Sequence, residues 1–201
     1  MKSIKSYVWD TVLFLKSWFH SPNQMGTIFP SSYITGKKIA QLIKDPQNSI
    51  VVELGAGTGQ VTDEIIAMGI PQDHFATIEY DPRLCKELSS KYPKGLNLLN
   101  IDAADMLEEL PKQFIGKTDY VISTLPLIPL KKEKALKIID SIFEVLKPGG
   151  VYVQVTLSPF KPKYMDELGL RATKLFVSWV NLPPMHVWRI SRKIKEVTVS
   201  I

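Results

Sequence analysis

Residues Ser49–Gly59, S-I-V-V-E-L-G-A-G-T-G, carry the strongest structural signal in this chain. The β-branched run Ile50–Val52 is typical of a buried strand, and the glycines at positions 55, 57 and 59 are typical of a tight turn. Glycine suits a turn that needs positive φ, and it lets a ligand lie against bare backbone. An amphipathic run begins at Gln60, and N–H groups at a helix start point toward such a ligand. The pattern therefore predicts a strand, a turn and a helix that together bind a cofactor.

Acidic residues further along the chain indicate which cofactor this is. A dinucleotide-binding turn has the spacing G-x-G-x-x-G, whereas this turn has G-x-G-x-G with Glu53 two residues before its first glycine. The next predicted strand ends in Glu79, about twenty residues beyond the turn, where a carboxylate accepts hydrogen bonds from ribose hydroxyls. Asp102 and Ala103 follow a third predicted strand and are placed to face an adenine edge.

These motifs, together with L-K-P-G-G at Leu146–Gly150, resemble those of class I S-adenosylmethionine-dependent methyltransferases. The resemblance implies S-adenosylmethionine as cofactor, with Glu53 at its methionine end, Glu79 on the ribose and Asp102 on the adenine amino group. The full set of cofactor-binding residues that it implies is Glu53, Gly55, Gly57, Gly59, Glu79, Asp102, Ala103 and Ser123. Two alternatives remain: an ordinary glycine-rich turn, and a nicotinamide oxidoreductase, which needs a second catalytic region that this chain has little room for.

Length and composition predict one folded domain. The chain has 201 residues, of which 45% are hydrophobic and 22% are charged, which is ordinary for a globular protein and argues against disorder. The formal net charge of +5 favours acidic partners, either nucleic acid or an anionic membrane surface. The single cysteine, Cys85, is interpreted as a packing residue in a reducing compartment. The three histidines are scattered and no cysteine cluster accompanies them, so no metal is expected.

Strands and helices alternate from Ile50 to Thr156, which predicts a parallel sheet with right-handed crossovers. Two further strands, Thr173–Val180 and Val187–Val199, are expected to form an antiparallel hairpin at the sheet edge. We therefore predict an α/β, Rossmann-like fold with a seven-stranded, mostly parallel sheet, an antiparallel edge hairpin and N-terminal helices. The expected inner strands are Ile50–Val52, Phe75–Glu79, Leu96–Asn100, Asp119–Thr124 and Val151–Thr156, and the expected helices are Tyr33–Lys44, Gln60–Met68, Pro82–Tyr92, Ala104–Leu110 and Lys131–Leu146. Leu146–Gly150 is expected to close the last helix, and the lysines at positions 131, 132, 134 and 137 are expected to form a solvated helix face.

The N-terminal part, residues 1–45, is predicted to differ in role from the methyltransferase domain, residues 46–201. Residues Ser3–His20 form an amphipathic helical pattern with aromatic side chains on one face and lysines on the other. Such a helix suits a membrane interface, although an amphipathic face equally suits packing on the domain. The segment from Gln24 through the helix beginning at Tyr33 is either a lid over the cofactor or a simple connector.

The methyl acceptor is expected beyond the fourth strand, at Ser123–Leu127, S-T-L-P-L, because ligands bind at the carboxyl ends of parallel strands. Methyl transfer from a sulfonium is an in-line displacement, so the protein mainly aligns the donor and the nucleophile. Enzymes that methylate bases have an amide and an aromatic residue here, and this chain has neither. The candidate catalytic residues are Ser123, Leu125 and Tyr33.

Four further motifs sharpen the resemblance: M-G-T-I-F-P-S-S, V-E-L-G-A-G-T-G, I-S-T-L-P-L, and N-L-P-P followed by V-W-R. They are similar to those of the soluble bacterial phospholipid N-methyltransferases, which are themselves related to the rRNA adenine dimethyltransferases. The resemblance implies methylation of phosphatidylethanolamine towards phosphatidylcholine by a cytoplasmic protein held peripherally on the inner, anionic face of the membrane by its N-terminal helix. Candidate substrate-binding residues are Ser32, Asn181, His186 and Arg189. Thr124 and Ile190 depart from the family pattern, so the headgroup stays open.

Two other functions remain open at this point. The first is RNA methylation, with basic residues such as Arg189 and Arg192 contacting phosphates. The second is a cofactor-binding membrane module that does not catalyse methyl transfer.

Overall fold

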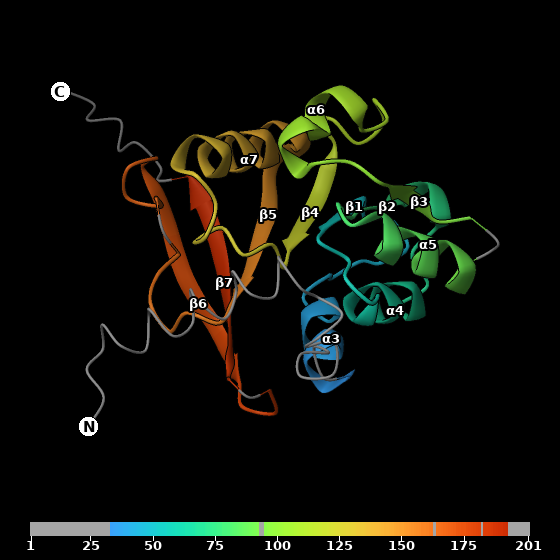
Figure 1. Ribbon diagram of the computed structural model, residues 1–201, viewed down its shortest axis with the longest axis horizontal. Coiled ribbons are helices and arrows are strands. Elements are labelled where there is room, and N and C mark those ends of the chain that lie inside the picture. Colours follow the sequence, from blue (N-terminus) through green and yellow to red (C-terminus); the bar gives the residue numbers. More distant parts are fainter. Residues whose placement is uncertain (1–32, 93–94, 163, 182, 193–201) are drawn as a thin grey trace, which may run out of the picture.

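A seven-stranded sheet forms the centre of the protein, which is described here as a computed structural model covering residues 33–92, 95–162, 164–181 and 183–192. The strand order is β3-β2-β1-β4-β5-β7-β6, with β1 to β5 parallel to one another and with β7 and β6 antiparallel at one edge (Figure 1). The predicted fold class is confirmed. The strands are β1 (Val51–Leu54), β2 (Phe75–Ile78), β3 (Asn97–Leu99), β4 (Thr118–Ser123), β5 (Leu146–Thr156), β6 (Leu170–Ser178) and β7 (Met185–Arg192).

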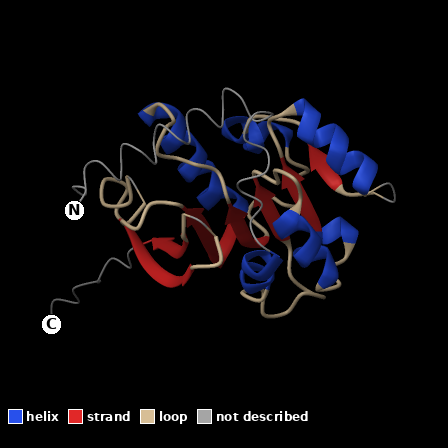
Figure 2. Ribbon diagram, turned by 60° about the horizontal axis from the view of Figure 1, so that its bottom comes forward, coloured by secondary structure: helices blue, strands red, loops and turns tan. Residues whose placement is uncertain are grey.

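Helices pack on both faces of this sheet (Figure 2). They are α3 (Tyr33–Ala40), α4 (Gln60–Ala67), α5 (Pro82–Lys91), α6 (Met106–Glu109) and α7 (Lys132–Val145), with short 3-10 turns η1 (Gln72–His74) and η2 (Ala103–Asp105). Ile39 of α3 and Ile65 of α4 join one buried cluster, while Ile138 and Ile142 of α7 join the other. Both faces of the central strands are thereby covered, which explains their continuous runs of Val and Ile.

The edges of several elements differ from the sequence-based expectation. Leu146–Gly150 does not close a helix, because α7 ends at Val145 and Leu146 already pairs with Thr118 of β4. Residues 104–110 form η2 followed by a single turn of α6 rather than one continuous helix. The chain after α3 turns more tightly than an α-helix, since Leu42 N donates to Ile39 O at 3.0 Å, so the predicted extension to Lys44 is wrong.

Several predictions concern residues outside the described ranges. They include the amphipathic helix Ser3–His20, the loop Gln24–Ser32 with the candidate residue Ser32, and the end of the last strand, residues 193–199. Within residues 33–92, 95–162, 164–181 and 183–192, no helix is long and apolar enough to cross a bilayer. The division into residues 1–45 and 46–201 stays a prediction.

The topology indicates at which edge of the sheet a ligand is expected to bind. Strand β1 lies between β2 and β4, and the chain reverses its direction of progress through the sheet at this point. Ligands of open parallel sheets bind beyond the carboxyl ends of the strands at such a switch point. The glycine turn after β1 and the loop after β4 both lie at that edge.

Candidate active site

The glycine turn has the geometry of a ligand seat. Gly55, Gly57 and Gly59 have φ values of 82°, 58° and 83°, which is the left-handed region that favours glycine. A Cβ atom on Gly55 would lie 2.9 Å from Leu125 Cδ2, and one on Gly59 would lie 2.8 Å from Leu88 Cδ2. A Cβ atom on Gly57 would meet nothing within 4 Å. Gly55 and Gly59 are therefore required by packing, whereas Gly57 presents bare backbone to open space.

Glu79 ties the turn to the end of β2. Its Oε2 accepts a hydrogen bond from Gly57 N at 2.8 Å, and its Oε1 accepts one from Asp81 N at 2.9 Å. The side chain is largely buried, with 8% of its surface exposed. Each carboxylate oxygen has a second lone pair, so Glu79 retains acceptor capacity for ribose hydroxyls. The predicted ribose role of Glu79 is compatible with this geometry and stays a prediction.

Glu53 is fully buried beneath α4. Its Oε2 accepts hydrogen bonds from Thr62 Oγ1 at 2.7 Å and from Thr77 Oγ1 at 3.0 Å, while its buried Oε1 has no hydrogen-bond partner among the described residues. Burial raises the pKa of the Glu53 carboxyl to about 7, although the two threonine hydrogen bonds oppose that shift. An orphaned carboxylate oxygen behind the glycine turn fits the positively charged methionine end of S-adenosylmethionine, reached directly or through water.

Asp102 caps η2 and forms an ion pair with α7. Its Oδ1 accepts from Ala104 N at 3.0 Å, and its Oδ2 pairs with Lys134 Nζ. Burial raises the pKa of Asp102, but the hydrogen bonds from Lys134 and from the Ala104 N–H outweigh this and lower it overall. Lys134 Nζ also lies 5.6 Å from the centre of the exposed Tyr80 ring. These contacts place Asp102 and the ring that follows Glu79 on the same side of the turn.

The lysines of α7 do more than form a solvated face. Besides Lys134, Lys132 pairs with Glu167 and Lys137 pairs with Asp105. Every one of these partners lies outside α7, so the lysines join the helix to neighbouring loops, while Lys132 and Lys137 remain exposed as expected. Sequence reasoning could not identify the pairs, because they connect residues that lie far apart in the chain.

The loop after β4 lies directly against the glycine turn. Thr124 Oγ1 donates to Gly55 O at 2.5 Å, and Leu125 N donates to Ser123 Oγ at 3.3 Å. On the other side, Leu125 O accepts from Gln154 Nε2 of β5 at 3.0 Å. Ser123 has no exposed surface, so it supports the loop, while the half-buried Leu125 side chain faces Gly55. The structure thus brings Ser123, Leu125 and Gly55 together, and the predicted catalytic roles of Ser123 and Leu125 stay predictions.

The candidate substrate residues are only partly brought together. Asn181 Oδ1 accepts from Thr35 Oγ1 of α3 at 2.6 Å, which holds the turn between β6 and β7 beside the predicted lid helix. His186 pairs in register with Thr156 at the end of β5, on the edge where the acceptor is expected. Arg189 is exposed, and because side chains alternate along a strand it lies on the opposite face of β7 from His186. Arg189 and His186 therefore cannot share one substrate contact.

His186 is a further titratable group at this end of the sheet. It is 7% exposed, and its Nδ1 is buried without a hydrogen-bond partner among the described residues. Burial and the nearby charge of Lys174 lower the pKa of the imidazole, so it is neutral at pH 7. Tyr33 is 60% exposed at the first residue of α3. Its placement beside the reacting groups stays a prediction.

Sequence reasoning missed several residues that build the site, namely Thr35, Thr62, Thr77, Tyr80, Lys134 and Gln154. For two of them a signal was present. Thr62 and Gln154 are polar residues in otherwise apolar positions, one on the buried face of α4 and one in the run V-Y-V-Q-V of β5. A buried polar side chain needs a partner, so each could have been expected to bond to a neighbouring functional loop.

Cys85 behaves as predicted. It is buried, its Sγ donates to Glu79 O at 3.2 Å, and burial raises the pKa of the thiol to about 11. The thiol is therefore protonated at neutral pH and contributes packing rather than nucleophilic chemistry.

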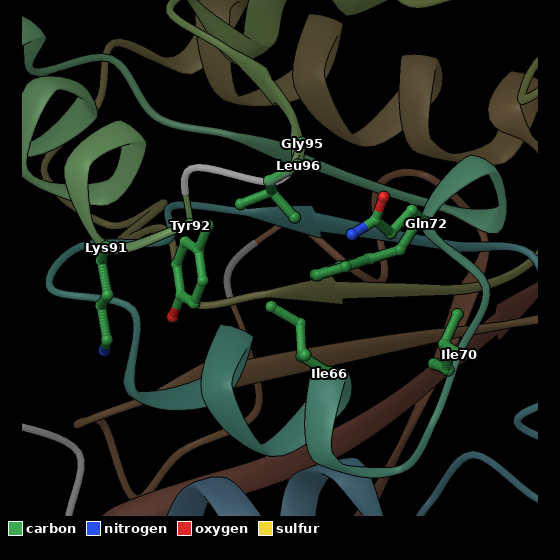
Figure 3. Close-up of a pocket in the computed structure, with 8 residues that line it drawn as sticks. Ile66, Ile70, Gln72, Lys91, Tyr92, Gly95 and Leu96 are labelled. Carbon is green, nitrogen blue, oxygen red and sulfur yellow. The ribbon is translucent and has the colours of Figure 1, made fainter.

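A separate groove lies between α4, α5 and the amino ends of β2 and β3 (Figure 3). It has a volume of about 300 Å³, and its lining residues are Ile66, Ile70, Gln72, Phe75, Lys91, Tyr92, Gly95 and Leu96. Phe75 begins β2 while Glu79 follows its other end, so most of the groove lies toward the amino edge of the sheet, although Tyr92 at its rim donates to Gly59 O at 3.4 Å. We assign it no part in cofactor binding.

Comparison with known proteins agrees with this geometry. Residues 51–150 match the family model described as a methyltransferase domain. The chain is 29% identical over 194 residues to the ornithine lipid N-methyltransferase of Singulisphaera acidiphila, covering 93% of this chain and 98% of that protein. It is also 33% identical over 93 residues to the ribosomal RNA small subunit methyltransferase A of Nitrobacter winogradskyi, but this match covers only 44% of this chain and 31% of that protein.

Solved structures support the same fold. The magnesium protoporphyrin IX methyltransferase of Synechocystis, solved with bound S-adenosylmethionine, superposes with a TM-score of 0.58 at 15% identity, over 80% of this chain and 79% of that chain. The precorrin-6y C5,15-methyltransferase of Geobacter metallireducens superposes with a TM-score of 0.60 at 15% identity, over 82% and 90%. These likenesses show the fold, and the matched family model together with the glycine turn shows that the chain contains a class I methyltransferase domain, whose cofactor is S-adenosylmethionine.

Proposed function

We propose that this protein transfers methyl groups from S-adenosylmethionine to the amine of a membrane lipid, converting phosphatidylethanolamine towards phosphatidylcholine. The observation that carries the proposal is the similarity to an ornithine lipid N-methyltransferase along nearly the full length of both chains. The match to the ribosomal RNA enzyme spans less than half of this chain, so it supports a shared cofactor-binding region and not a shared RNA substrate.

The loop after β4 suits an aliphatic amine better than a nucleobase. The loop Ser123–Leu127 has neither the amide nor the aromatic residue of base-methylating enzymes, and the aliphatic side chain of Leu125 lies against Gly55. S-adenosylmethionine supplies an electrophilic methyl group on a sulfonium. The protein's own contribution is to hold the acceptor in line with that methyl group, and the hydrogen bonds that tie the loop to Gly55 and Gln154 fix its position.

An amine attacks only in its neutral form, so a proton must leave the lipid ammonium before transfer. Burial lowers the pKa of His186, which lies at the carboxyl end of the sheet, so its neutral imidazole is able to accept a hydrogen bond from the amine. We assign His186 the role of positioning the amine, and the proton that leaves the lipid ammonium passes to solvent.

The proposed substrate implies contact with a membrane. We propose that the protein is cytoplasmic and binds the inner face of the membrane peripherally, with the N-terminal helix Ser3–His20 as one anchor. The basic net charge of +5 favours such an anionic surface.

The experiment that tests the substrate compares headgroups. Purified protein is incubated with methyl-labelled S-adenosylmethionine and with vesicles that contain phosphatidylethanolamine, ornithine lipid, or phosphatidylglycerol alone as the amine-free control. We expect label in phosphatidylethanolamine and none in phosphatidylglycerol. Label in ornithine lipid alone would show that the proposed headgroup is wrong and would support the proposal of lipid N-methylation. Absence of label from both amine lipids, with cofactor binding intact, would contradict the proposal.

A further inference from the structure

Large apolar side chains are exposed at the turn between β6 and β7. Trp179 is 77% exposed and Val180 is 56% exposed. On the adjacent start of α3, Tyr33 is 60% exposed and Ile34 is 46% exposed. A contiguous group of exposed apolar residues on a folded protein marks an interaction site more often than isolated ones do. We call these four residues the hairpin surface.

Buried hydrogen bonds hold the two halves of this surface together. Thr35 Oγ1 donates to Asn181 Oδ1 at 2.6 Å and lies 2.5 Å from Ser178 Oγ. All three side chains are nearly inaccessible to solvent. Since Thr35 follows Tyr33 and Ile34 while Ser178 and Asn181 flank Trp179 and Val180, these bonds hold together the two segments that carry the four apolar residues. Figure 1 shows the turn projecting from the sheet beside α3.

All charged residues of the elements that carry the hairpin surface are basic. From Leu170 through Arg192 the chain contains no Asp or Glu, and neither does α3. On α3, Lys37 Nζ lies 5.8 Å from the centre of the Tyr33 ring, and Lys38 Nζ lies 5.9 Å from the centre of the Phe176 ring on β6. Aromatic rings flanked by lysines complement an anionic bilayer, whose headgroups meet the charges while rings and aliphatic chains enter the interface.

The position of the surface relates it to the methyl acceptor. Val177 pairs with His186, which pairs with Thr156 at the end of β5, and Ser178 pairs with Met185 one position further out. The turn therefore extends past the carboxyl edge of the parallel strands, where the glycine turn and Ser123 also lie. A bilayer resting on the hairpin surface would face the end of the sheet at which the acceptor is expected.

We propose that Trp179, Val180, Tyr33 and Ile34 form a docking surface for an anionic lipid bilayer, in addition to any anchor at residues 3–20. Its link to the methyl acceptor rests on the proposed lipid methylation. The binding itself requires no methyl transfer, so the two proposals can fail independently. The occupant is a bilayer rather than RNA because the most exposed group is a single indole beside a valine and an isoleucine, an arrangement that enters an interface more readily than it follows a phosphate backbone.

The test measures partition of the full-length protein onto vesicles of phosphatidylglycerol and phosphatidylcholine by sedimentation. The double variant Trp179→Glu with Val180→Glu should bind about tenfold or more weakly, because it replaces interfacial apolar area with negative charge. Leu107→Glu is the matched control, since Leu107 is 40% exposed on α6, away from the turn, and should bind as the wild type does. Thermal unfolding checks that both variants are folded.

A second readout locates the indole directly. In a background with Trp9→Phe and Trp18→Phe, the remaining tryptophans are Trp179 and the buried Trp188. Lipids with brominated acyl chains should quench the fluorescence, and adding Trp179→Phe should remove the quenched component. Equal vesicle binding by the double glutamate variant and the wild type, or no quenching of Trp179, would overturn the proposal. Loss of RNA binding with unchanged vesicle binding would also overturn it, in favour of a nucleic-acid surface.

Discussion

Substitution of Gly57 tests the cofactor site directly, because its effect on folding stability can be measured separately from its effect on cofactor affinity. Gly57→Ala keeps the N–H that donates to Glu79, and the added Cβ meets no protein atom within 4 Å. Its cost to folding therefore comes from the φ of +58° alone, about 1–2 kcal/mol for an L side chain in the left-handed region. In a chain of this size, we expect the Tm to fall by about 2–4 °C for each kcal/mol.

The matched control is Gly169→Ala. Gly169 has a φ of +63° and also has nothing within 4 Å of its Cβ position, but it lies before β6, outside the glycine turn. Both variants should lose similar stability. Only Gly57→Ala should weaken S-adenosylmethionine binding, by more than about tenfold or 1.4 kcal/mol, because the methyl group enters the space against which the cofactor lies.

Isothermal titration calorimetry measures the S-adenosylmethionine affinity of the wild type and of the two variants. Thermal unfolding gives their Tm values. Equal cofactor affinity in Gly57→Ala and Gly169→Ala would refute the assignment of the open side of the turn to the cofactor. A loss of affinity in both would indicate that the effect comes through stability.

Three further predictions follow from other contacts. Glu79→Gln places an amide where Gly57 N and Asp81 N both donate, so calorimetry should show cofactor affinity reduced by about 1–3 kcal/mol, and unchanged affinity would remove Glu79 from the site. Burial raises the folded-state pKa of Glu53 to about 7, above its unfolded value, so the cofactor-free protein should lose up to about 3 kcal/mol of folding stability as pH rises from 4.5 to 7. Glu53→Gln should flatten this pH dependence in denaturant titrations. An identical pH profile in the variant would contradict the assignment of the dependence to Glu53. Thr35→Val removes the 2.6 Å hydrogen bond to Asn181 Oδ1 and leaves the longer one from Ser178 Oγ at 3.4 Å, so it should lower the unfolding free energy by about 1–3 kcal/mol, whereas a cost within error would show that the Thr35 bond does not hold α3 to the hairpin.

The parts of the site that sequence predicted are those encoded by neighbouring residues. The positive φ of Gly55, Gly57 and Gly59 and the location of Glu79 at a strand end follow from local pattern, since turn, strand and helix signals are short-range. The hairpin at the edge was likewise visible from its two extended runs. Its strand alternation also places His186 and Arg189 on opposite faces, a consequence that could have been drawn from the sequence.

The parts that sequence did not predict depend on contacts between distant segments. Asp102 meets Lys134 across 32 positions, and Thr35 meets Asn181 across 146. No local pattern encodes such pairs, because they exist only once the sheet order has been set. The boundary at Leu146 was wrong for a similar reason: a Pro-Gly-Gly sequence ordinarily ends a helix, but pairing of Leu146 with Thr118 extends β5 back to that residue.

The central claim is that the glycine turn delivers a methyl group to a lipid amine. The most direct measurement incubates wild-type protein and Gly57→Ala with methyl-labelled S-adenosylmethionine, giving each either vesicles of phosphatidylethanolamine and phosphatidylglycerol or total RNA without vesicles. We predict label in the lipid phase with the wild type, little with Gly57→Ala, and none in RNA. Label in RNA with none in lipid would contradict the claim and would make this an RNA methyltransferase.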